Sequence, residues 1–173
     1  MIASKKYFAI ASATGAMGAL LFSTPSATAA TPTSYVSDEC SSSGNRYCFS
    51  IHYNSRGAQT NYSASPCFVT NKNIPNHYGY SPNGAALVRY VFRPAQISGT
   101  GATCVLSNDG DGKGVQNNGA SASNGECNVM NRVYVYSGYG GPSQAFYPTC
   151  GDYWPSDNLV TTLKNNNASH ERY

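Results

Sequence analysis

Residues 129–141 read VMNRVYVYSGYGG, and this stretch decides the fold class of the chain. Its first eight residues are rich in β-branched and aromatic side chains, which is typical of a β-strand. Tyr139-Gly140-Gly141-Pro142 then supplies the turn chemistry that reverses the chain. The stretch therefore predicts a strand over 129–136 that turns back on itself.

Shorter segments of the same character recur along the chain. We expect further strands at residues 47–53, 87–92, 104–106, 145–147 and 159–163. No segment repeats apolar residues at helical spacing. Many short strands with dense turn signals predict an all-β sandwich or a closed barrel.

Charged residues make up only 11% of the chain, whereas an average soluble domain has about a quarter. The sequence has no basic stripe of the kind that nucleic-acid-binding proteins carry. It also lacks the Ala, Glu, Lys and Leu enrichment of a helical bundle, and its many aromatic residues argue against disorder. We expect a small, turn-rich globular domain that binds no nucleic acid.

Residues 1–29 have the organisation of a secretory signal peptide. Lys5 and Lys6 precede a mostly apolar run over 7–22, and Ala27-Thr28-Ala29 fits an A-x-A cleavage site. Cleavage there would remove two of the 11 basic residues and leave nine against eight acidic ones, so net charge says little about partners. We expect a secreted, extracellular protein, free of the membrane after cleavage, that begins with an N-terminal arm at 30–39.

The remaining chain holds all of the cysteines: Cys40, Cys48, Cys67, Cys104, Cys127 and Cys150. An even number of cysteines in an exported chain predicts a disulfide framework, for which fifteen pairings of six cysteines exist. The short turn between Cys40 and Cys48 favours that pair. Order along the chain would then give Cys67–Cys104 and Cys127–Cys150. Zinc is not indicated, because there is no C-x-x-C pair and the three histidines are scattered singly.

The chain also resembles itself. Residues 115–121 (VQNNGAS) align with 163–169 (LKNNNAS), and residues 51–58 (IHYNSRGA) align with 134–141 (YVYSGYGG). The second alignment places Tyr53 opposite Tyr136. Two copies of one motif that share a core are the simplest explanation. We expect the two N-N-x-A-S segments to occupy equivalent places in the fold.

These features resemble the Greek-key motifs of βγ-crystallins. Tyr134-x4-Tyr139-x-Gly141 is similar to their aromatic hairpin, and the N-N-x-x-S segments are similar to their Asx-rich loops. Cys40, Arg46-Tyr47-Cys48 and the aromatic strand that follows resemble secreted actinobacterial peptidase inhibitors of the metalloproteinase-inhibitor type. The resemblance implies a two-motif Greek-key sandwich over residues 40–173. Motif one then covers 40–124 with an insertion at about 59–112, and motif two covers 125–173.

The resemblance also implies a calcium site in the Asx-rich loops. Its ligands would be Asn117, Asn118, Ser121, Asn165, Asn166 and Ser169. Calcium affinity rises with the charge of the oxygen ligands, and these side chains are neutral, so we expect binding to be weak at best. The alternative is that the asparagines form Asx turns and the serines cap backbone groups. No cofactor is required.

The resemblance further implies a non-enzymatic peptidase inhibitor whose partner is an extracellular metallopeptidase. An inhibitor presents a rigid loop, often pinned by a disulfide, because preorganisation lowers the entropy lost on binding. Pro66-Cys67-Phe68-Val69 has this character, as does Thr103-Cys104-Val105-Leu106; the alternative for both is a core strand beside a disulfide. A weak calcium-binding structural module and a killer-toxin-like antimicrobial protein are the other functions open to such a fold. We expect a monomer.

Catalysis is not indicated by the sequence. The chain contains neither G-x-S-x-G nor H-E-x-x-H. His52 alternates with the apolar face of its strand and His170 lies near the end of the chain, so we expect both to be solvated. The turn residues Tyr78, Tyr80, Tyr139, Tyr153 and Trp154 are expected at the surface, where aromatic side chains can bind carbohydrate or protein.

Overall fold

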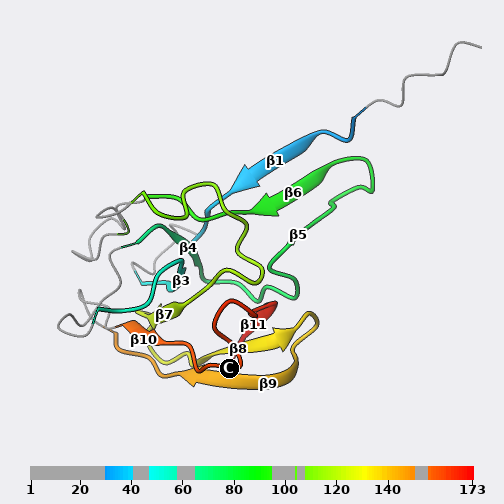
Figure 1. The fold of residues 1–173 in the computed structure, drawn as a ribbon. Helices are drawn as coiled ribbons and strands as arrows, with labels where there is room; N and C mark the ends of the chain where they lie inside the picture. The colour runs from blue at the N-terminus through cyan, green and yellow to red at the C-terminus, as the bar shows by residue number, and fades with distance from the viewer. Residues whose placement is uncertain (1–29, 41–46, 58–64, 95–103, 105–107, 151–155) are drawn as a thin grey trace, which may run out of the picture. The chain divides into compact units, whose positions relative to one another are not determined.

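A computed structural model describes residues 30–40, 47–57, 65–94, 104, 108–150 and 156–173 (Figure 1). The predicted signal peptide lies outside these residues. The described part contains strands and turns without any helix, so the all-β prediction is confirmed. It accordingly has no helix with the length and apolar character that a membrane crossing needs.

The largest sheet has five strands in the order β10-β7-β3-β4-β2. These strands are β10 (Ser156–Asn158), β7 (Ser121–Asn124), β3 (Phe49–His52), β4 (Cys67–Thr70) and β2 (Asp38–Glu39). Neighbours are antiparallel except β2 and β4. Ile51 at the centre pairs with Phe68 on one side and with Ala122 on the other.

A second sheet has the order β11-β8-β9 and is antiparallel throughout. Its strands are β11 (Ser169–Arg172), β8 (Asn131–Tyr136) and β9 (Gly140–Phe146). β8 lies within the strand predicted at 129–136, and Gly138 and Tyr139 reverse the chain with φ values of 73° and 65°. The hairpin that decides the fold class is therefore formed.

The third sheet has the order β1-β6-β5, with β1 parallel to β6. Its strands are β1 (Thr33–Val36), β6 (Leu87–Tyr90) and β5 (Gly79–Tyr80). Gly79 has φ 130°, and a Cβ there would lie 1.8 Å from the carbonyl oxygen of Val88, so only glycine fits. The segment expected to be an N-terminal arm is part of the sheets instead. It forms β1, which pairs with β6, and β2, which pairs with β4.

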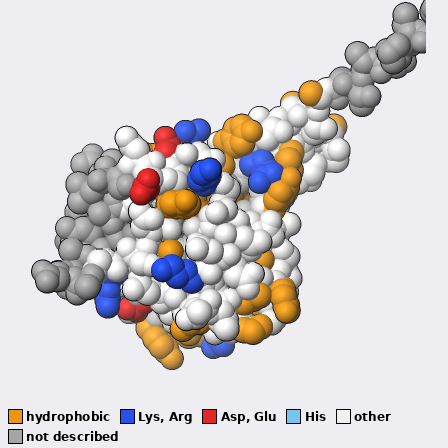
Figure 2. Space-filling model, in the orientation of Figure 1, with side chains coloured by type: hydrophobic (Ala, Val, Ile, Leu, Met, Phe, Trp, Pro, Cys, Tyr) orange, Lys and Arg blue, Asp and Glu red, His pale blue; other side chains and the backbone are white. Residues whose placement is uncertain are grey.

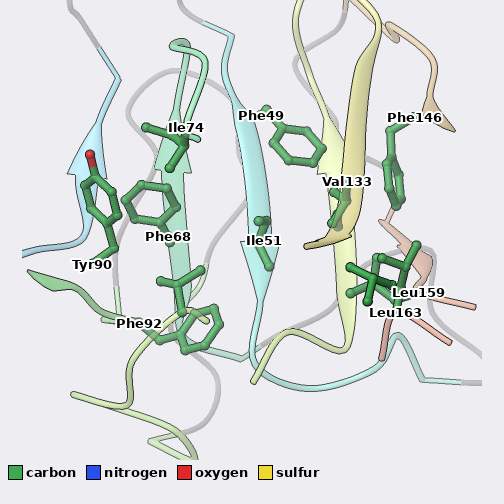
Figure 3. Packing of buried hydrophobic residues seen from close by; sticks show 13 residues of the cluster. Phe49, Ile51, Phe68, Ile74, Tyr90, Phe92, Val133, Phe146, Leu159 and Leu163 are labelled. Atoms are coloured by element: carbon green, nitrogen blue, oxygen red, sulfur yellow. The ribbon is translucent and has the colours of Figure 1, made fainter. Parts of the chain in front are cut away.

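One apolar core joins the first two sheets (Figure 3). Phe49, Ile51 and Phe68 extend into it from the five-stranded sheet, and Val133 and Phe146 extend into it from β8 and β9. The ring centroids of Phe49 and Phe146 are 5.7 Å apart. The two sheets thus pack as a sandwich, in which burying each large side chain contributes roughly 1.5–3 kcal/mol.

Two groups of strand predictions need correction. Residues 159–163 form no strand: Leu159 and Leu163 are buried in the core from an irregular segment and turn that follow β10. Conversely, β7 and β11 were not predicted. Their sequences, SASN and SHER, have no alternation of apolar and polar residues, although most of their side chains are buried.

The three predicted disulfides, Cys40–Cys48, Cys67–Cys104 and Cys127–Cys150, are confirmed. No described cysteine is free. Cys48, Cys67, Val69 and Cys104 form a second apolar cluster next to β3 and β4. Three disulfides in one domain favour an oxidising, extracellular environment.

Candidate functional site

The two N-N-x-A-S segments lie against each other and exchange equivalent hydrogen bonds. The amide of Asn117 donates to the carbonyl of Asn167 (2.9 Å), and the amide of Asn165 donates to the carbonyl of Gly119 (2.8 Å). Asn117 and Asn165 are matching positions and have φ values of 60° and 56°. The reciprocal pair is what an approximate two-fold relation between the segments would produce.

The strand alignment of the repeat needs a shift of one residue. The hydroxyl of Ser121 donates to the carbonyl of Asn54 (2.7 Å), and the hydroxyl of Ser169 donates to that of Tyr136 (2.6 Å). Asn54, and not Tyr53, is therefore the counterpart of Tyr136. The corrected register matches Ile51 with Val133, both of which are core residues. The alignment of Tyr53 with Tyr136 did not pair these two buried residues with each other.

Four of the six side chains proposed as calcium ligands form hydrogen bonds to backbone carbonyls of the protein itself. The amide group of Asn118 donates to the carbonyls of Gly114 and Gln116, and that of Asn166 donates to Thr162, each at 3.0 Å. The hydroxyls of Ser121 and Ser169 donate to the carbonyls of Asn54 and Tyr136. Within the described ranges, no group of three or more acidic, histidine or cysteine side chains lies at either loop. These contacts favour the structural alternative for the loops.

The segment Pro66-Cys67-Phe68-Val69 cannot serve as an exposed inhibitory loop. All four residues are buried, and the last three belong to β4, which lies between β3 and β2. The ring centroid of Phe68 is 4.9 Å from that of Tyr90 in the core. In the second segment, Cys104 is buried and bonded to Cys67, while Thr103, Val105 and Leu106 lie outside the described residues.

The expectation that His52 and His170 are solvated is wrong, since both side chains are buried. His170 lies next to His77, which is also buried. His170 Nε2 lies 3.1 Å from the Lys72 carbonyl, which can only accept, so this nitrogen carries the proton. His170 Nδ1 then accepts from His77 Nε2 at 2.9 Å. His77 Nδ1 in turn accepts from the side-chain amide of Asn167, also at 2.9 Å. The chain of donors requires both rings to be neutral.

The surroundings keep these rings neutral. Burial lowers the pKa of His170 to about 3 and that of His52 to about 4. Burial, followed by repulsion from His170, holds the pKa of His77 well below its ordinary value. Nothing in the sequence pattern points to this cluster, because its members are polar residues from distant segments.

His52 belongs to a separate buried cluster of hydroxyl groups. Its Nε2 lies 3.0 Å from the Ser50 hydroxyl and 3.3 Å from that of Ser123, which is 2.7 Å from that of Ser156. His52 also lies close to the sulfur atoms of Cys67 and Cys104. Because these sulfur atoms form a disulfide, they supply no thiolate for a metal. The cluster is at most 4% exposed and offers a substrate no access.

Glu126 is the buried acidic residue of the described chain. Its carboxylate accepts from Arg172 Nε at 3.0 and 3.1 Å, from Arg172 Nη2, and from the Asn131 amide at 2.9 Å. Arg172 is 29% exposed in its side chain, whereas Glu126 is fully buried. This ion pair joins β11 to the loop before β8. The carboxylate oxygens of Glu126 are not exposed to solvent.

A surface hollow of about 260 Å³ is a concave site among the described residues. It lies where the third sheet meets the loop between β4 and β5, and Glu39, Lys72, Asn73, Asn76, Tyr80 and Tyr90 line it. Tyr80 and the nearby Tyr78 are exposed, as expected, whereas Tyr139 is half-buried. Tyr153 and Trp154 lie outside the described residues.

Comparison of the chain with known protein families, with curated proteins and with solved structures gave no match.

Proposed function

We propose that this protein is a secreted, non-enzymatic inhibitor of an extracellular metallopeptidase, built as a two-motif Greek-key sandwich of the βγ-crystallin type. Contacts between the two halves support the proposed topology. β10 follows the second-half hairpin but pairs with β7 of the first half. Ile74, from the first half, forms an isolated bridge with His170 of β11. Each half therefore contributes to the edge of the other half's sheet, one through a strand and one through a single bridge.

The observation that carries the inhibitor proposal is the disulfide between Cys67 and Cys104. Cys67 lies in a central strand and Cys104 is fully buried. A segment attached to such an anchor loses little conformational entropy when it binds, and the disulfide would retain both ends if a protease cut nearby. With residues 66–69 buried, Thr103–Leu106 becomes the proposed inhibitory segment.

The state of the acid–base groups supports a non-enzymatic role. His52, His77, His170 and Glu126 are each at most 4% exposed and make hydrogen bonds within the protein. A general acid or base must reach the substrate directly or through one water molecule. In the face shown in Figure 2, Lys and Arg side chains are scattered singly, which also supports a partner other than nucleic acid.

The test is inhibition of a thermolysin-type enzyme by the oxidised secreted protein, with a subtilisin-type enzyme for comparison. We expect inhibition of the metallopeptidase, and a loss of at least about tenfold in affinity for Leu106→Asp. Tyr147→Ala, at a residue that is 74% exposed and outside the segment 103–106 of the sequence, is the matched control. Absence of inhibition of the metallopeptidase at micromolar protein concentration would overturn the proposal.

A further inference from the structure

The surface hollow beside the third sheet has polar groups held in fixed positions. The Asn76 side-chain oxygen accepts from the amide of Tyr78 (3.0 Å) and from the Ser137 hydroxyl (3.3 Å). The Asn73 side-chain oxygen accepts from the amide of Arg172 (2.9 Å). Both side chains are thereby oriented through their oxygen atoms. Neither amide NH₂ group has a hydrogen-bond partner within the described ranges, so both remain available to a ligand.

Tyr90 adds a hydroxyl group to the hollow. The residue as a whole is only 5% exposed, yet it lines the hollow, and its hydroxyl has no hydrogen-bond partner in the part of the chain that the structure describes. The hydroxyl oxygen is accessible from the hollow, where it can bind solvent or a ligand. Burial, and after it the charge of Glu39, raises the pKa of Tyr90, so the hydroxyl remains protonated. It can therefore both donate and accept inside the hollow.

The walls of the hollow are aromatic and apolar. The ring centroids of Tyr80 and Tyr90 are 6.0 Å apart, and Ile74 and Pro75 complete the lining. The guanidinium of Arg89 covers the ring of neighbouring Tyr78 at 3.3 Å. Tyr80 has no such cover among the described cation–π contacts and is 47% exposed. Its ring is the one that can stack against a ligand.

The charges at the hollow cancel. Lys72 Nζ forms an ion pair with Glu39, whose side chain is only 14% exposed. An anionic or a cationic ligand would have to compete with this pair. A ligand with neutral hydroxyl groups can instead donate to the carboxylate and accept from the ammonium, the two amide groups and the Tyr90 hydroxyl.

From these features we propose that the hollow binds one neutral pyranose ring of a saccharide. Such a ring has an apolar face, which fits Tyr80, and an edge of hydroxyl groups, which fits the fixed amide groups. A volume of about 260 Å³ is below the roughly 300–1,000 Å³ of pockets for drug-sized ligands and suits a single ring. None of the lining residues belongs to the proposed inhibitory segment, so this proposal does not depend on inhibition. The hollow would hold the secreted protein on a polysaccharide surface.

The experiment is an NMR titration of the ¹⁵N-labelled, oxidised secreted protein with three neutral saccharides: N,N′,N″-triacetylchitotriose, cellotriose and maltotriose. We expect at least one of them to shift the side-chain NH₂ signals of Asn73 and Asn76, at saccharide concentrations up to about 20 mM, which reach even a Kd in the millimolar range. Tyr80→Ala should weaken binding at least about tenfold, whereas Tyr80→Phe should bind like the wild type because it keeps the ring. Tyr147→Ala is the control for loss of an exposed tyrosine and should leave binding unchanged.

The same titration contains the outcomes that would overturn the proposal. These are no shift with any of the three saccharides, shifts confined to residues outside the hollow, or equal binding by Tyr80→Ala. Binding of a sulfated saccharide with no binding of the neutral ones would reject the neutral ligand class. Spectra that retain the wild-type dispersion of backbone signals would show that each variant is folded.

Discussion

His77 Nε2 donates to His170 Nδ1 over 2.9 Å, and this hydrogen bond joins residues that are 93 positions apart in the chain. The bond requires a neutral acceptor ring, and burial enforces that state in the folded protein. In the unfolded chain both rings regain the ordinary histidine pKa of about 6.5. Folding is therefore coupled to the release of protons.

The first prediction is a loss of stability in mild acid. Between the unfolded pKa of about 6.5 and the folded values of about 3 for His170 and about 4 for His52, the unfolded state binds more protons. Stability is therefore fully present above pH 6.5 and falls as pH decreases, by about 1.4 kcal/mol per pH unit for each buried histidine. Urea unfolding between pH 7.5 and 4.5 measures this slope.

His77→Gln removes one titrating group from the cluster. This variant should be less stable than the wild type at pH 7 but should lose less stability per pH unit on acidification. A wild-type free energy of unfolding that stays constant from pH 7 to pH 4.5 would contradict the buried neutral state of the histidines.

The second prediction concerns Asn167, which connects the histidines to the N-N-x-A-S segments. Its side-chain oxygen accepts from the Gly119 amide (2.8 Å), and its NH₂ group contacts the Val115 carbonyl and His77 Nδ1 (both 2.9 Å). Asn167→Ala would leave the Gly119 amide and His77 Nδ1 without partners, while the Val115 carbonyl keeps the Asn118 amide as a donor (3.3 Å). The substitution should cost at least about 2 kcal/mol of unfolding free energy. Asn166→Ala, at an exposed position with one local hydrogen bond, is the matched control and should cost about 1 kcal/mol or less. Equal losses for the two variants would refute the special role of Asn167.

These residues also show what the sequence can and cannot predict. The pattern of aromatic and β-branched residues was sufficient to predict β3 and β8. The short turn between Cys40 and Cys48 and the order of the other cysteines favoured the pairs that the structure has, although the sequence left other pairings open. β11 escaped prediction because Ser169 and His170 are buried through hydrogen bonds, which leave no apolar pattern. Burial of a polar residue depends on partners from distant segments, and a single sequence does not show which segments meet.

The candidate site was less predictable than the fold. The prediction of the disulfide between Cys67 and Cys104 was correct. The large apolar side chain of Phe68, however, suits a core strand and an exposed interface anchor equally well, and the structure places it in the core. The hollow is formed by side chains from β2, β5, β6 and the loop after β4. β5 and β6 belong to the third sheet, whereas β2 belongs to the five-stranded sheet, and a single sequence does not show that these strands meet.

The third prediction concerns the pair of Glu126 and Arg172. Arg172→Ala would leave a fully buried carboxylate without its cation and should cost about 3–5 kcal/mol of unfolding free energy. Arg56→Ala is the matched control, because its ion pair with Asp157 (3.6 Å) is largely exposed and should contribute less than about 1 kcal/mol. Adding Glu126→Gln to Arg172→Ala should restore part of the loss, since it removes the unpaired charge. A double variant no more stable than Arg172→Ala would contradict this explanation.

The fourth prediction is a small response to calcium. The Ser121 and Ser169 hydroxyls already donate to backbone carbonyls, and the Asn118 and Asn166 amides stabilise their own loops. With a Kd near 1 mM, about 10 mM calcium would add only about 1.4 kcal/mol of stability. Thermal unfolding with calcium, and with magnesium as the control, measures the effect. A rise in Tm of tens of degrees at micromolar calcium would show that a strong site exists and would favour the calcium-module alternative.

The fifth prediction separates the core from the proposed inhibitory segment. Phe68 is fully buried beside Tyr90, so Phe68→Ala should lower the unfolding free energy by about 3–5 kcal/mol. Tyr147→Ala, at an exposed position in the same domain, should change it by less than about 0.5 kcal/mol. Inhibition by the fraction of Phe68→Ala that remains folded should equal that of the wild type, because the side chain does not reach a partner. If the unfolding free energy were unchanged and the binding free energy of the inhibitor weakened by about 2 kcal/mol or more, Phe68 would be an interface anchor. That result would contradict the burial of β4.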